Sequence, residues 1–134
     1  MKSWLPIYCL AAGSADAATG LMLLAAPAFV FGRLSLGPLP APPVFASFVG
    51  AFVLAVGLSY LYPLALGAGG LAARWRQLFE TTAISRLSVA AFLALALWGR
   101  QLGAAWGLVL ATDLGVALFQ LYLLRRSASE ASSR

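Results

Sequence analysis

Three ionisable side chains stand inside long apolar stretches of the sequence. Asp16 and Asp113 each lie 11 residues into such a stretch, and Arg86 lies near the middle of another. A charge at the centre of a membrane helix costs about 2.5–3.5 kcal/mol on insertion scales, so unpaired charges there are unfavourable. Because a guanidinium can engage two carboxylates, we expect Asp16, Arg86 and Asp113 to meet in one polar cluster near the middle of the bilayer.

This cluster has two interpretations. In the structural one, Arg86 bridges the two acids and fixes helix order and register, a use attested for buried ion pairs. In the chemical one, two acids and one base leave an excess negative charge, so one aspartate holds a proton and serves as a proton relay, an acid catalyst or an anchor for a polar head group. Asp16, Asp113 and Glu80 are the acid–base candidates, and no catalytic residue is assigned.

Helical phase adds polar neighbours to the cluster. At 100° per residue, Thr82 lies within about 40° of Arg86, and Gln120 shares the face of Asp113. Small residues beside Asp16, such as Gly13 and Gly20, leave space for a partner side chain or a ligand. The full candidate ligand-binding set is Asp16, Glu80, Thr82, Arg86, Asp113 and Gln120.

Glu80 is expected at a different depth in the bilayer from the cluster of Asp16, Arg86 and Asp113. It lies about 9 Å from Arg86 along a helix, towards the side we take as cytoplasmic. Arg76 stands one turn earlier, so an interfacial ion pair and a ligand-facing acid are both open. If the protein has an opening, we expect it near Glu80, Thr81 and Thr82.

Composition places these residues in a membrane protein. The chain has 134 residues, of which 62% are hydrophobic and 10% charged. Soluble domains carry about 25% charged residues, so the composition excludes a soluble domain and equally a disordered chain. With no histidine and one cysteine, Cys9, a metal centre is not expected, and no cofactor is identified. The net charge of +5 does not indicate nucleic-acid binding, because no basic soluble module is present.

The apolar stretches predict an all-α fold. We expect one domain over residues 1–134, an integral membrane four-helix bundle with helices at 5–31, 44–66, 75–98 and 102–124. The Pro-rich segment 32–43 and the Gly-rich segment 67–73 connect the first three helices. The short link 99–101 makes the last two an antiparallel hairpin. Residues 125–134 form a Ser- and Ala-rich flexible tail.

Basic residues predict the orientation. With four crossings both termini lie on one side, and the positive-inside rule makes that side cytoplasmic. The multi-pass protein is therefore expected in the bacterial inner membrane. Six basic residues fall on the cytoplasmic side, namely Lys2, Arg74, Arg76, Arg125, Arg126 and Arg134, against Arg33 and Arg100 on the other.

Small residues recur every four positions near the C-terminal end, at Gly103, Gly107, Ala111 and Gly115. Such a stripe permits close helix approach, either to the third helix or to a second subunit. Gly50 and Gly57 form a weaker version.

In its order of elements, the chain resembles the small four-helix membrane proteins of the DoxX-like kind. The resemblance is carried by GLMLLAAPAF at 20–29, FASFVGAFVLAVGLSYL at 45–61, Arg86 of ISRL and Asp113 of ATDLGVALFQ. It implies a compact four-helix bundle. The quinone-coupled sulfur oxidation linked to the family name is not carried over, because no motif for that chemistry is present.

Three functions fit these patterns. The first is an accessory, assembly or structural subunit of a larger membrane complex or homo-oligomer. The second is a binding protein or acid–base enzyme for a lipid-like molecule such as a quinone or isoprenoid. The third is a small proton-coupled transporter. Whether the protein is an enzyme stays open at this point.

Overall fold

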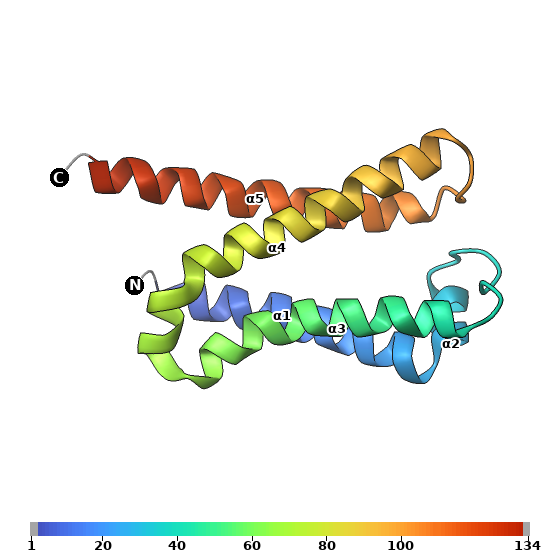
Figure 1. Cartoon of the computed structure of the whole chain (residues 1–134), viewed down its shortest axis with the longest axis horizontal. Coiled ribbons are helices and arrows are strands. Elements are labelled where there is room, and N and C mark those ends of the chain that lie inside the picture. The colour runs from blue at the N-terminus through green and yellow to red at the C-terminus, as the bar shows by residue number, and fades with distance from the viewer. Residues whose placement is uncertain (1–2, 133–134) are drawn as a thin grey trace. The chain divides into compact units, whose positions relative to one another are not determined.

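The computed structural model describes residues 3–132, and within this range all regular secondary structure is helical. Lys2 and Arg134, which entered the charge count, lie outside the described residues. The helices are α1 (Leu5–Ala25), α2 (Pro27–Arg33), α3 (Val44–Ala65), α4 (Gly67–Trp98) and α5 (Trp106–Ser132), as Figure 1 shows. All but α2 include stretches long and apolar enough to cross a membrane. The predicted all-α class and four candidate spans are therefore confirmed.

The first predicted helix, 5–31, is wrong in its length. The helix ends at Ala25, and Pro27 starts a separate short helix, α2. The reason is steric, because the proline ring disfavours the helical conformation of the residue before it. Ala26 accordingly adopts φ −147° and ψ 61°.

The third predicted helix starts too late. α4 begins at Gly67, so the Gly-rich segment 67–73 is helical and not a connecting loop. Its alanines favour a helix and it contains no proline. The turn between α3 and α4 includes Gly67, whose φ of +78° lies in the region that glycine adopts without strain.

The last helix is displaced from its predicted bounds of 102–124. α5 begins at Trp106, after a non-helical segment that includes Arg100 at φ +55°. It continues to Ser132, so most of the predicted tail 125–134 is helical. Ser127 Oγ and Ser129 Oγ donate to the carbonyl oxygens of Leu124 and Arg126, three residues earlier, which is compatible with a helix.

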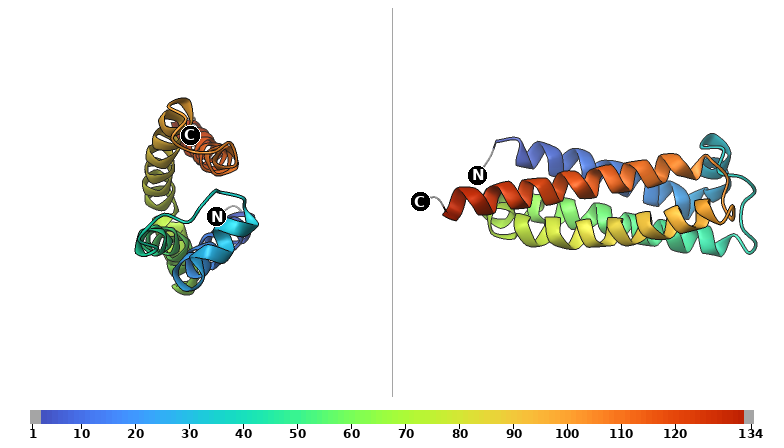
Figure 2. Two further views of the ribbon diagram at one scale, coloured as in Figure 1. Left: turned by 90° about the vertical axis from the view of Figure 1, so that its right-hand side faces the viewer. Right: turned by 90° about the horizontal axis from the view of Figure 1, so that it is seen from above.

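The chain divides into two compact units, Met1–Trp75 and Arg76–Arg134, and each is described by itself. In the first unit, α1 and α3 lie side by side (Figure 2). They pack through glycines: a Cβ added to Gly57 would lie 2.4 Å from Ala17 N, and one added to Gly20 would lie 2.4 Å from Leu54 N. The two backbones therefore touch, as small residues in membrane helices permit.

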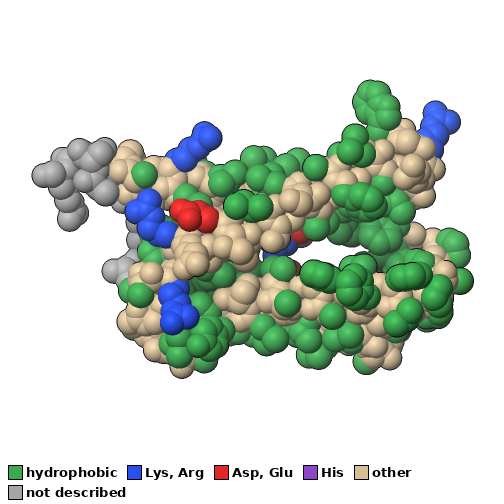
Figure 3. Space-filling model, in the orientation of Figure 1, with side chains coloured by type: hydrophobic (Ala, Val, Ile, Leu, Met, Phe, Trp, Pro, Cys, Tyr) green, Lys and Arg blue, Asp and Glu red, His purple; other side chains and the backbone are tan. Residues whose placement is uncertain are grey.

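The outward faces of the helices are apolar. Figure 3 shows many hydrophobic side chains on the visible surface of the helices. Large side chains such as Ile7, Phe52, Phe92 and Leu95 are each more than 60% exposed. Soluble monomers rarely expose contiguous apolar surface of this extent, so the pattern fits a lipid environment.

Candidate functional site

The buried face of α4 carries two polar residues among apolar ones. Thr82 and Arg86 are both buried and stand one helical turn apart. Apolar residues at helical spacing continue the face on either side of them. These are Leu71, Leu78, Phe79, Ala83, Ala90, Leu93 and Ala96.

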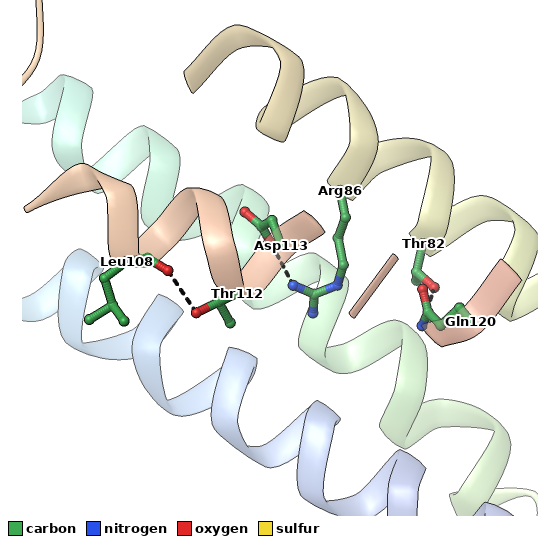
Figure 4. Close-up of polar contacts among 6 residues, drawn as sticks. All are labelled: Thr82, Arg86, Leu108, Thr112, Asp113 and Gln120. Atoms are coloured by element: carbon green, nitrogen blue, oxygen red, sulfur yellow. Dashed lines mark hydrogen bonds and ion pairs between the residues drawn. The ribbon is translucent and has the colours of Figure 1, made fainter. Parts of the chain in front are cut away.

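Arg86 pairs with Asp113 across the second unit. Arg86 Nη1 donates to Asp113 Oδ1 at 2.6 Å, and the two side chains are only 9% and 16% exposed (Figure 4). This part of the predicted cluster is confirmed. Buried from solvent, the pair neutralises two charges that would each be costly alone in an apolar surrounding.

A second polar contact lies beside the ion pair. Gln120 Nε2 donates to Thr82 Oγ1 at 3.1 Å, and the Thr82 hydroxyl donates to the carbonyl oxygen of Leu78 at 2.8 Å. Gln120 and Thr82 are both buried. The candidate residues Thr82, Arg86, Asp113 and Gln120 are therefore brought together, as Figure 4 shows.

The two contacts together set the direction and register of α5 against α4. Arg86 follows Thr82 along α4, whereas its partner Asp113 precedes Gln120, the partner of Thr82, along α5. The helices are therefore antiparallel, as the short link between them predicts. We call these two contacts the polar staple.

The small-residue stripe begins before α5, at Gly103, and its glycines do not pack closely against α4. A Cβ added to Gly103, Gly107 or Gly115 would find no described atom within 4 Å. The expected close approach of this stripe to the preceding helix is therefore not seen in the described part of the chain. Docking to a second subunit stays a prediction.

Asp16 lies half-buried on α1, in the first unit. Its place in the cluster with Arg86 stays a prediction, since the units are described separately. The space expected beside it is partly corrected. The Cβ positions of Gly13 and Gly20 are filled by α3, through Leu61 and Tyr60 in the first case and through the Leu54 backbone in the second.

Glu80 and Thr81 are exposed on α4, apart from the staple. The predicted pair of Glu80 with Arg76 and the predicted opening near Thr81 stay predictions.

Cys9 is fully buried in α1. Among the described residues, no group of three or more His, Cys, Asp or Glu side chains is arranged to hold a metal ion.

One contact outside this site was missed by sequence reasoning. The Arg74 guanidinium carbon lies 5.6 Å from the centroid of the Tyr62 ring, a cation–π distance. An available signal was an aromatic residue in the last turn of one span and an arginine near the start of the next.

No family model, curated protein or solved structure matches the chain in the comparisons made. The resemblance to DoxX-like proteins therefore stays a prediction.

Thr82→Val should destabilise the protein by about 1 kcal/mol, because it removes the acceptor of Gln120 inside an apolar surrounding. Thr112→Val is the matched control: its hydroxyl donates only to Leu108 O on its own exposed helix face, so its effect should be close to zero. Unfolding by SDS in mixed micelles, followed by circular dichroism, measures both. Equal losses for the two variants would contradict a contribution from the Thr82–Gln120 bond.

Proposed function

We propose that the protein is a small multi-pass subunit of the bacterial inner membrane, with both termini cytoplasmic, that acts as an accessory or assembly component of a larger membrane complex. Within the second unit, the polar staple sets the register of α5 against α4. The role is structural and not catalytic.

The observation that carries this proposal is the staple itself. Arg86 and Asp113 form a short ion pair, and Gln120 bonds Thr82 in the same helix pair. Polar groups that bond one another across two helices define a single register, since every slipped register leaves a charge without this partner. Such a device suits a protein whose task is to present a defined surface.

The test separates a structural use of the charges from a chemical one. The double variant Arg86→Met with Asp113→Leu removes both charges while keeping side-chain bulk. If the role is structural, the folded double variant should still co-purify in mild detergent with the same partner at the same stoichiometry, judged by native mass spectrometry.

The contrasting result is equally definite. If the folded double variant loses a lipid-like molecule that the unmodified chain retains, the acid–base or ligand-binding function replaces this proposal. The same holds if the unmodified chain is recovered only as a homo-oligomer carrying such a molecule.

A further inference from the structure

Aromatic residues gather at one end of the first unit. The rings of Trp4 and Tyr8 lie edge to face with centroids 6.2 Å apart, and Tyr8 meets Tyr60 in the same way at 6.2 Å. Tryptophan and tyrosine are enriched at the depth of lipid head groups, because their rings are apolar and their N–H and O–H groups are polar. This end of the unit therefore has the composition of a membrane interface.

Arg74 lies at the same end, over the ring of Tyr62. Tyr62 is in the last turn of α3 and is 57% exposed, and Arg74 is exposed two turns into α4. The guanidinium carbon is 5.6 Å from the ring centroid. A guanidinium held over an aromatic face keeps its N–H groups at its edge, where they can donate to a phosphate in pairs.

The charge of Arg74 has little to oppose it within the first unit. The sequence contains no Asp or Glu between Asp16 and Glu80, and Asp16 is the only acid of residues 1–75. Asp16 lies in the fourth turn of α1, about 12 Å along the helix from Tyr8. Glu80, the next acid along α4, lies six residues beyond Arg74 and outside the first unit. An exposed, oriented arginine with so little opposing charge in its own unit attracts an anion.

We propose that Arg74 and Tyr62 form a binding site for the head-group phosphate of an anionic phospholipid. Arg74 donates to the phosphate oxygens, and the face of the Tyr62 ring orients the guanidinium. The exposed apolar side chain of Leu66, in the turn between α3 and α4, offers a surface for the first part of an acyl chain. This inference rests on the membrane location proposed above.

The experiment counts lipids on the full chain in detergent by native mass spectrometry, with phosphatidylglycerol or phosphatidylcholine added at rising concentrations. We expect the first phosphatidylglycerol to bind more tightly than phosphatidylcholine. Arg74→Gln should weaken that binding about fivefold, the effect of one basic residue near an anionic membrane surface. The affinity of Arg74→Lys for phosphatidylglycerol should lie between those of the unmodified chain and Arg74→Gln, because lysine keeps the charge and loses the paired donors.

Arg33→Gln is the matched control, because it removes one exposed positive charge from the first unit at the end of α2. It should leave phosphatidylglycerol binding unchanged. Equal weakening by Arg33→Gln and Arg74→Gln would overturn the site in favour of a general charge effect. Displacement of the lipid by millimolar inorganic phosphate would overturn it in favour of a free-anion site.

The failure of this inference differs from the failure of the proposed function. A protein that inserts into lipid nanodiscs but shows no preference for phosphatidylglycerol contradicts only the lipid site. A protein that does not insert contradicts the membrane location on which both proposals rest.

Discussion

Alanine at Gly20 or Gly57 should destabilise the protein by about 2–3 kcal/mol, because an added methyl group has no space between α1 and α3. The new Cβ would lie 2.4 Å from a backbone nitrogen in both cases, Leu54 N for Gly20 and Ala17 N for Gly57. A backbone atom cannot rotate away as the end of a side chain can. The helices must separate, and the contacts along the whole seam weaken with them.

Gly69→Ala is the control for this prediction. Gly69 is also a helical glycine of the first unit, but a Cβ there meets no described atom within 4 Å. Alanine should be neutral or stabilise the helix by up to about 1 kcal/mol, as its higher helix propensity predicts. SDS unfolding followed by circular dichroism compares the three variants. A similar effect at all three positions would show that α1 and α3 do not pack as closely as described.

Removing one member of the ion pair should have the largest effect. Asp113→Leu leaves Arg86 charged and buried without its carboxylate, and Arg86→Met leaves Asp113 in the reverse position. Breaking a buried ion pair by removal of one partner typically costs about 3–5 kcal/mol, because an uncompensated charge remains in an apolar surrounding. We expect both single variants to unfold at much lower SDS concentration or to fail to accumulate in the membrane.

The control for charge loss alone is Glu80→Leu. Glu80 is an acid on α4 that is exposed and lies outside the staple. Its replacement should change the free energy of unfolding by less than about 1 kcal/mol, the usual range for exposed charges. If Glu80→Leu is as harmful as Asp113→Leu, the loss at Asp113 does not report on the pair with Arg86.

Long uninterrupted apolar stretches allowed the spans to be predicted well. The predicted helix 44–66 differs from α3 by only one residue, at its C-terminal end. Its bounds were predictable because a proline precedes the helix and Gly67 follows its last turn. Where the predicted helix bounds were wrong, the properties of individual residues determined where the helices begin and end. Pro27 ended α1 early, and the alanines of 67–73 continued α4 through a segment whose glycines suggested a loop.

The pairing of Arg86 with Asp113 was also predictable, because two opposite charges in adjacent apolar helices have a strong energetic reason to meet. The use of the glycines was predictable only in part. Gly50 and Gly57 were expected to permit close helix approach, and both do so against α1. Gly13 and Gly20 stand beside Asp16 in helical phase, yet they serve contact with α3. The stripe at Gly103–Gly115 gives the more regular pattern, yet its glycines make no close contact with α4. Spacing reveals that a helix face is small, but the partner of that face depends on tertiary packing.

The central claim is that Arg86 and Asp113 stabilise the helix pair through each other. A double-mutant cycle tests it most directly, with Arg86→Met, Asp113→Leu and both together compared in SDS unfolding. We expect the double variant to be more stable than either single variant and to recover most of the loss, because neither Arg86 nor Asp113 then keeps its charge in the absence of the other. If the two losses add in the double variant, the side chains act independently, and Arg86 and Asp113 do not stabilise the helix pair through each other.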